Sequence, residues 1–168
     1  PIKICAMQEL GAQVNLVSGG YGEAEQAGIA YALANQAAWI SPYNDGQVIS
    51  GQGTLALEVL SDLADPHDYQ WLVPVGGGGL ISGIGAVLAA LAPSHQLIGV
   101  QSEASAFMHG LFERGTQQGV LDLPSLADGL SGPVEAGAMT IPLVRQYVHQ
   151  IILVREGEIA AAIAQAWQ

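Results

Sequence analysis

The sequence predicts an α/β fold, in which a parallel β-sheet carries helices on both faces. Half of the 168 residues are hydrophobic, which is enough for a sizeable core. Short apolar segments alternate along the chain with longer segments of helical periodicity, and this alternation is typical of a parallel sheet built from βαβ units. A run of four glycines, Gly76 to Gly79, separates one apolar segment from the helical segment that follows it.

The predicted helices combine an apolar or alanine-rich face with stop signals at their ends. They cover Ile2–Leu10, Tyr21–Asn35, Gln47–Leu63, Leu80–Leu91, Ala104–Arg114, Thr140–Tyr147 and Glu156 onward. The predicted strands are short and apolar, or alternate polar and apolar residues. They cover Gln13–Val17, Trp39–Ile40, Trp71–Val75, Leu97–Val100 and Ile151–Val154. Loops are expected between these elements, including Asp65–Asp68, Gly115–Leu126 and Gly129–Gly137.

Two glycines, Gly51 and Gly53, fall in the first turns of the helix predicted over Gln47–Leu63. Each costs about 1 kcal/mol of helix stability relative to alanine. Such a cost indicates either close packing or the close approach of a ligand.

The charge balance restricts the partners of the chain. The formal net charge is −11, with only four lysines and arginines, whereas binding to nucleic acid or to an anionic membrane requires clustered basic residues. No apolar run approaches the roughly 18 residues needed to cross a bilayer. Cys5 is the only cysteine, so a reducing, cytoplasmic location is expected. Because the chain has so few basic side chains, a phosphate ligand would depend mainly on backbone amides and a helix dipole.

The glycine run has the properties of a phosphate cradle. Successive glycine amides can converge on one anion, and the N-terminus of the following helix adds roughly half a positive charge. A tight turn without a ligand is the alternative, although two glycines would suffice for it. A dinucleotide site would need the G-x-G-x-x-G spacing, and its third position falls here on Ile81 or Ser82. Glu103 does follow the next predicted strand, where a ribose-binding acid would lie.

A hydrolase is a third interpretation, with the glycines as an oxyanion loop. It requires a nucleophile on a G-x-S-x-G turn, which the chain lacks, and Ser82 lies within a predicted helix. The four histidines, which are expected at the surface or in loops, are scattered without metal-ligand spacing, at His67, His95, His109 and His149.

Several motifs occur in an order that resembles a known family. They are Ser41-Pro42-Tyr43-Asn44-Asp45, Gly51-Gln52-Gly53-Thr54, Val73-Pro74-Val75 with Gly76 to Leu80, and Ala127-Asp128-Gly129-Leu130. Together they resemble the threonine dehydratase and serine racemase family of fold-type II pyridoxal-phosphate enzymes, which share the fold of the tryptophan synthase β chain. The similarity extends over essentially the whole chain and includes Ala6 to Ala12 and Val154 to Ile159.

The resemblance implies a set of cofactor-binding residues. The phosphate of pyridoxal phosphate is expected at the amides of Gly76, Gly77, Gly78, Gly79 and Leu80. Tyr43 and Gln52 are expected to border the active site, and Gly129 to lie near the cofactor ring. Turn packing by Tyr43 and loop capping by Asp128 are equally open interpretations.

The departures from the family pattern concern catalysis. The family's Schiff-base lysine lies in a Ser-Phe-Lys context that is absent here, and the only lysine, Lys3, is in a different segment. The Asn-bearing loop that contacts the cofactor ring and the Ser- or Cys-bearing segment that faces the pyridine nitrogen are also absent. Gln101 and Phe107 occupy positions where some relatives bind a divalent cation. We therefore expect no catalytic residue and no metal site in this chain.

The resemblance also implies a domain division and a function. Residues 1–40 are expected to be the remainder of a small domain, and residues 41–168 most of a large, phosphate-binding domain. The chain is expected to be a fragment or truncated relative of an ammonia-releasing lyase that acts on hydroxy amino acids, catalytically incomplete but able to bind a small phosphate ligand or an amino acid. One alternative is a non-enzymatic, truncated paralogue that binds a partner or forms homo-oligomers through uncovered core surface. The other is a repurposed, esterase-like hydrolase.

Overall fold

The computed structural model describes residues 2–63 and 69–167, which form two compact units that divide between Trp39 and Ile40. The assignment of the two units to the small and large domains of the family stays a prediction. The loop expected over Asp65–Asp68 lies outside the described residues. None of the described helices combines the length and the apolarity needed to cross a membrane.

The first unit contains two helices, α1 (Ile2–Glu9) and α2 (Tyr21–Asn35). Helix α2 begins where the Glu23 carboxylate accepts a hydrogen bond from the Gly20 amide at 2.9 Å. The strand predicted over Gln13–Val17 is wrong, and so is the one over Trp39–Ile40, because neither segment is paired in a sheet. Alternation of polar and apolar residues forms a strand only where another strand is available to accept its hydrogen bonds.

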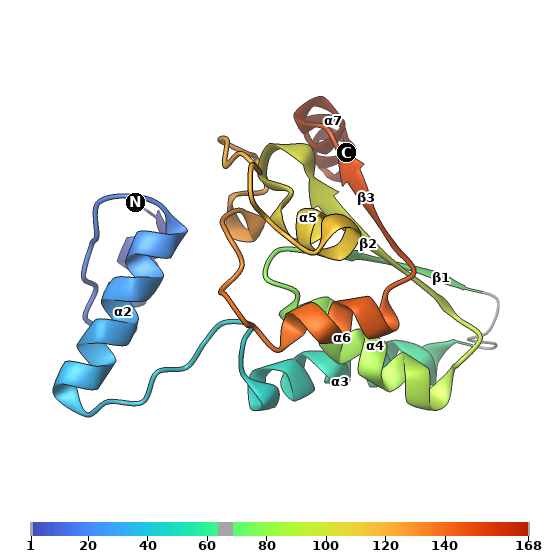
Figure 1. Cartoon of the computed structure of the whole chain (residues 1–168), viewed down its shortest axis with the longest axis horizontal. Coiled ribbons are helices and arrows are strands. Elements are labelled where there is room, and N and C mark those ends of the chain that lie inside the picture. The colour runs from blue at the N-terminus through green and yellow to red at the C-terminus, as the bar shows by residue number, and fades with distance from the viewer. Residues whose placement is uncertain (1, 64–68, 168) are drawn as a thin grey trace. The chain divides into compact units, whose positions relative to one another are not determined.

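The second unit is built around three parallel strands in the order β1-β2-β3. Its strands are β1 (Gln70–Pro74), β2 (Gln96–Ser102) and β3 (Gln150–Val154). Its helices are α3 (Gly46–Asp62), α4 (Gly79–Leu91), α5 (Phe107–Arg114), α6 (Thr140–Tyr147) and α7 (Glu156–Ala166), with short 3-10 turns η2 (Glu103–Ser105) and η3 (Asp128–Leu130). Figure 1 shows α3, α4 and α6 together on one side of the sheet. The predicted α/β fold with a parallel sheet is confirmed.

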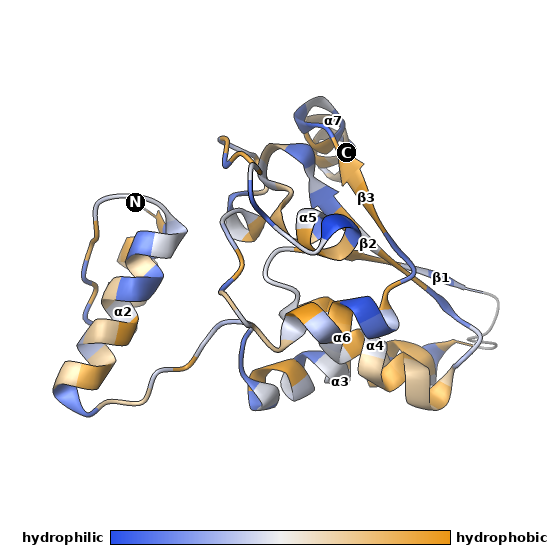
Figure 2. Ribbon diagram, viewed as in Figure 1, coloured by the Kyte–Doolittle hydropathy of each residue, from blue (hydrophilic) through white to orange (hydrophobic). Residues whose placement is uncertain are grey.

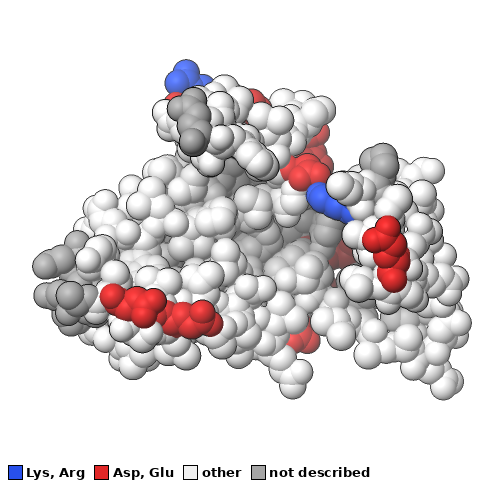
Figure 3. Space-filling model, turned by 180° about the vertical axis from the view of Figure 1, so that it is seen from behind, with Lys and Arg blue, Asp and Glu red and all other residues white. Residues whose placement is uncertain are grey.

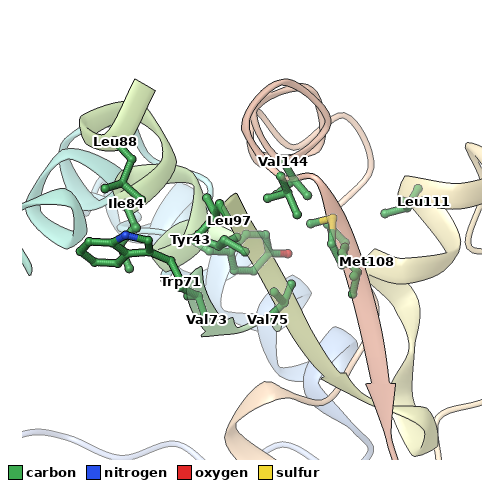
Figure 4. Close-up of a cluster of buried hydrophobic side chains, with 14 of the residues drawn as sticks. Tyr43, Trp71, Val73, Val75, Ile84, Leu88, Leu97, Met108, Leu111 and Val144 are labelled. Carbon is green, nitrogen blue, oxygen red and sulfur yellow. The ribbon is translucent and has the colours of Figure 1, made fainter. Parts of the chain in front are cut away.

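One face of the sheet carries the hydrophobic core. In β1 the residues alternate, with Trp71 and Val73 buried and Leu72 exposed. Figure 4 shows the side chains of Trp71 and Val73 of β1 on the same side as those of Ile84 and Leu88 of α4. The core cluster also takes side chains from β2, β3, α3, α5 and α6. Helices are therefore packed on this face of the sheet.

The opposite face of the sheet, which we call the open face, carries Leu72, Val100 and Ile152, together with Ile98, which is buried. Leu72 is 60% exposed and Ile152 is 36% exposed. Helix α7 has no buried residue within the described part of the chain. Figure 2 shows most of β3 in the hydrophobic colour, because Gln150 is followed by four apolar residues. The acidic side chains do not form one large patch on the surface in Figure 3, where they lie in separate small groups.

Helices α3 and α4 cross at a pair of glycines. A Cβ atom on Gly83 would lie 2.7 Å from the Gly53 nitrogen, and one on Gly53 would lie 2.9 Å from the Gly83 oxygen. Gly51, in contrast, has no other group within 4 Å of its Cβ position. Close helix packing, and not a ligand, therefore accounts for Gly53.

The helix predicted over Ala104–Arg114 begins later than expected. The Ser102 hydroxyl accepts a hydrogen bond from the Ala104 amide at 3.1 Å and caps the short turn η2. Helix α5 then begins at Phe107 and ends before Gly115, which has a left-handed backbone with φ of 76°. Local capping by a serine, at the end of a strand, divides the predicted helix into two pieces.

Candidate cofactor-binding site

The glycine run forms the turn from β1 into α4. The Val75 amide donates the last hydrogen bond to β2, at 2.8 Å from the Val100 oxygen. Helix α4 begins at Gly79, and the preceding residue, Gly78, has a φ of 88°. A Cβ atom on Gly78 would also lie 2.9 Å from the Met108 methyl group. Both backbone conformation and packing therefore require glycine at this position.

The other glycines of the turn touch protein atoms. A Cβ atom on Gly77 would collide with the ring of Tyr43, and one on Gly76 would lie 3.1 Å from the backbone of Leu130. Tyr43 is 7% exposed, and its hydroxyl accepts a hydrogen bond from the Glu135 amide at 2.8 Å. The structure therefore shows Tyr43 as a packing residue of the turn, which is one of the two interpretations from the sequence. A role of Tyr43 in ligand binding stays a prediction.

The backbone amides of the turn are available for an anion. Among the described residues, none of the N–H groups from Gly76 to Ile81 donates a hydrogen bond to another group of the chain. The first donor of α4 is Ser82, whose amide lies 3.0 Å from the Gly78 oxygen. The turn is partly to fully buried, where unpaired N–H groups are costly. The N-terminal dipole of α4 adds positive potential at the same place.

The remaining predicted site residues differ in their position. Gly79 and Leu80 lie in the first turn of α4. Gly129 lies in η3, and its neighbour Leu130 contacts Gly76, so the two motifs are brought together. Gln52 is exposed on α3, and within the described part of the chain its side chain makes no hydrogen bond. Participation of Gln52 in a site thus stays a prediction without a structural contact to support it.

Side chains from distant segments hold the turn, and sequence reasoning missed them. The Thr140 hydroxyl donates a hydrogen bond to the Gly77 oxygen at 2.7 Å, across 63 positions of sequence. The Asn44 side chain donates to the Glu135 carboxylate at 2.7 Å and accepts from the Met139 amide at 2.9 Å. The motif around Tyr43 is thus joined by hydrogen bonds to the loop that contains Glu135 and Met139. Asn44 and Glu135 are 91 positions apart in the sequence, so no local spacing reveals the pairs.

A second missed residue, Glu156, holds the segment that leads to η3. Its carboxylate accepts hydrogen bonds from the Leu126 amide and from the hydroxyls of Ser102 and Ser125, each at 2.7 Å. These bonds, that of the Leu126 amide first, hold the pKa of Glu156 below the ordinary value of a glutamate. The negative charge is thereby favoured at a point that joins β2, α7 and the segment before Leu130.

The hydrolase interpretation loses its nucleophile in the structure. Ser82 is 0% exposed, and its hydroxyl has no hydrogen-bond partner. His95 was expected in a loop or at the surface; it lies in a turn but is buried, with its ring 5.9 Å from that of His149. His67 lies outside the described residues.

Gln101 and Phe107, where the resemblance places the cation site of some relatives, make contacts within the protein. The Gln101 side chain accepts a hydrogen bond from the His109 amide at 2.9 Å, and Phe107 belongs to the hydrophobic core. In the parts of the chain that the structure describes, no three His, Cys, Asp or Glu side chains are grouped so that they could hold a metal ion.

A glycine turn that joins the carboxyl end of a parallel strand to a helix recurs among proteins that bind phosphate groups. Residues 1–168 match the family described as pyridoxal-phosphate dependent enzyme. The chain belongs to this family.

Relatives and solved structures agree with this assignment. The L-threonine ammonia-lyase of Thermotoga maritima is 40% identical over 161 residues, which are 96% of this chain and 39% of the relative. The processed form of threonine deaminase isoform 2 from Solanum lycopersicum has a TM-score of 0.86 at 30% identity, over 99% of this chain and 48% of that chain. Maize serine racemase has a TM-score of 0.85 at 26% identity, over 100% of this chain and 52% of that chain. The chain thus spans about half, or less, of the proteins that it matches.

Proposed function

We propose that this chain binds pyridoxal phosphate through its phosphate group, at the backbone amides from Gly76 to Leu80. The observation that carries the proposal is the row of N–H groups without acceptors at the start of α4. Backbone amides and a helix dipole suit a chain with a net charge of −11, which has few basic side chains to offer. The membership of the family supports the identity of the ligand.

The proposed lineage is an ammonia-lyase that acts on threonine or serine. When bound, the cofactor delocalises the negative charge that develops at the α-carbon of an amino acid. The residues of this chain would hold the phosphate at the glycine turn, with Leu130 and Tyr43 packed behind it. Gly129 lies beside Leu130 and is proposed to face the ring.

We propose further that the chain alone does not complete the lyase reaction. The reaction would require a lysine amine to hold the cofactor covalently. Lys3 is the only lysine, and it belongs to α1, outside the family's Ser-Phe-Lys context. The chain would therefore supply the phosphate anchor of the site and not its amine.

A titration that compares pyridoxal phosphate with pyridoxal tests the anchor. Binding of the first and not of the second, followed by absorbance and fluorescence, is the expected result. Gly77→Asp should abolish binding, whereas the matched change Gly51→Asp, where there is space, should not. Circular dichroism checks that both variants are folded. Equal binding of the two ligands, or none by the wild type, would contradict the proposal.

A second experiment tests whether the site is complete. Borohydride reduces an imine between lysine and cofactor to a stable covalent bond. After reduction with borohydride in the presence of pyridoxal phosphate, the mass of the chain should be unchanged. A mass increase by one cofactor at Lys3 would show that the chain supplies its own amine.

Self-association is the second candidate function, favoured by the open face and by the outer edge of β1, with which no strand of the described residues pairs. A hollow of about 380 Å³ lies along this edge and is lined by apolar side chains, among them Leu55, Val59 and Leu80. Exposed strand edges and apolar surfaces promote pairing between copies. Leu72→Lys should shift the chain towards the monomer in sedimentation experiments, whereas Leu121→Lys, in an exposed loop, should not. A wild type that is monomeric at high concentration would exclude this function.

A further inference from the structure

The direction of an amide in the glycine turn depends on a hydrogen bond to the carbonyl of the same peptide. In a trans peptide the C=O and N–H bonds point in opposite directions. A donor that fixes the carbonyl of one residue therefore fixes the N–H of the next residue on the other side. The glycines themselves restrain the peptide planes of the turn little, because glycine populates a wide range of backbone angles.

Two such donors act on consecutive peptides of the turn. The Thr140 hydroxyl donates to the Gly77 oxygen at 2.7 Å, so the Gly78 amide points away from Thr140. The Ser82 amide donates to the Gly78 oxygen at 3.0 Å, so the Gly79 amide points away from the body of α4. The second bond is a regular feature of a helix start, whereas the first depends on one side chain.

Thr140 is placed so that its hydroxyl has little freedom. The residue is 0% exposed, and its Cβ lies 3.2 Å from the Cβ position of Gly78. It is the first residue of α6, and its hydroxyl turns to the glycine turn and not to its own helix. Since a buried hydroxyl without a partner is costly, the bond to Gly77 is maintained in the folded chain.

We propose that Thr140 is a positioning residue, which aims the Gly78 amide at the phosphate-binding side of the turn. The inference rests on the proposed phosphate site. It adds that the Thr140 hydroxyl orders the glycine turn before the ligand binds. Without the hydroxyl, the Gly77–Gly78 peptide loses the partner of its carbonyl, and the cost of ordering it is added to the binding of the anion.

The experiment uses the full chain with pyridoxal phosphate and inorganic phosphate as probes. Thr140→Val removes the hydroxyl and keeps the shape, and we expect it to weaken both affinities about five- to tenfold, the effect of one lost hydrogen bond. Thr140→Ser keeps the hydroxyl and should bind within about twofold of the wild type. Thr54→Val is the matched control, because the Thr54 hydroxyl also donates to a backbone carbonyl, that of Gly51, at 2.8 Å on the exposed side of α3. It should bind as the wild type does.

Nuclear magnetic resonance separates orientation from stability. The Gly77 carbonyl carbon and the Gly78 amide should change their chemical shifts in Thr140→Val, return in Thr140→Ser and stay unchanged in Thr54→Val. If Thr140→Val does not fold, Thr140→Ala and Thr140→Ser are compared, since both lack the methyl group and only the first lacks the hydroxyl.

The outcomes distinguish the two proposals. A wild type that binds neither probe overturns the phosphate site and, with it, the role of Thr140. A wild type that binds, together with a Thr140→Val variant of equal affinity, overturns the role of Thr140 alone. Equal loss of affinity in the serine and valine variants would assign the effect to a general disturbance of packing around residue 140 and not to the hydroxyl, and this too would overturn the inference.

Discussion

Replacement of Gly77 by alanine tests the packing of the glycine turn. The added Cβ atom would lie 2.5 Å and 2.7 Å from the two Cδ atoms of the Tyr43 ring, whereas ordinary contacts begin at 3.4 Å. Tyr43 must then withdraw by roughly 1 Å in a core that packs like a crystal. The ring is held at its other end, because the Tyr43 hydroxyl accepts a hydrogen bond from the Glu135 amide at 2.8 Å.

The magnitude follows from these two contacts. An added carbon in a packed core costs about 1–3 kcal/mol. Loss of the bond between Tyr43 and Glu135 would add ~1 kcal/mol. We expect Gly77→Ala to lower the free energy of unfolding by ~2–4 kcal/mol. Gly51→Ala, on the exposed side of α3 with nothing within 4 Å, should instead raise it by about 0.5–1 kcal/mol.

Urea unfolding, followed by circular dichroism, measures both changes. The same alanine is also introduced into a Tyr43→Ala background, where the ring that obstructs it is gone. There Gly77→Ala should cost nothing further, although Tyr43→Ala is itself destabilising. An equal cost of Gly77→Ala in both backgrounds, or no cost in the wild type, would refute the assignment of the collision to Tyr43.

Three further predictions concern the surroundings of the turn. Glu156→Gln should destabilise the chain at neutral pH. Because the pKa of Glu156 is lowered in the folded state, this difference should shrink as the pH falls through that lowered pKa, where the carboxylate of the folded wild type becomes protonated. Urea unfolding over a pH series measures it, and a difference that is independent of pH would contradict the charged hydrogen bonds. Asp45→Ala should lower the free energy of unfolding by about 1 kcal/mol, because the Asp45 carboxylate caps α3 by accepting hydrogen bonds from the amides of Gln47 and Val48. An unchanged unfolding midpoint would show that water replaces the cap. Leu88→Ala should cost about 2–5 kcal/mol in the same assay, since Leu88 is fully buried in the core cluster, and a smaller loss would indicate that the core closes over the cavity.

The helices that were predicted well from the sequence are those whose ends are marked by nearby residues. The helix after the glycine turn was expected from Leu80 and begins at Gly79, and the helix Tyr21–Asn35 has the predicted bounds. Glycine, capping residues and apolar periodicity lie within one or two turns of these ends, so no distant partner is needed to recognise them. The strand predicted over Gln13–Val17 fails for the opposite reason, because a strand depends on a neighbour that sequence alone does not provide.

The candidate site shows the same limit. The glycines of the turn were found from their own run, and their amides lie at the predicted start of a helix. The motif Ala127 to Leu130 was also expected near the cofactor, but its contact with Gly76 and the hydrogen bond from Thr140 were not predicted, since Leu130 and Thr140 both reach the turn from far along the chain. Tyr43 was named as a neighbour of a ligand, and the structure shows it in contact with Gly77. Side-chain contacts across the fold follow from tertiary packing, and one sequence carries no signal for them.

The outer edge of β1 does not offer the same hydrogen-bonding groups along its whole length. In a parallel ladder the N–H and C=O of one residue point to the same side, and the Val75 amide points to β2. Gln70, Leu72 and Pro74 therefore turn their main-chain groups outward. Proline has no N–H, so the outer edge ends in a carbonyl without its donor. A strand that adds to this edge would find full pairing at Gln70 and Leu72 and only an acceptor beside the glycine turn, which limits the registers in which any second sheet can join.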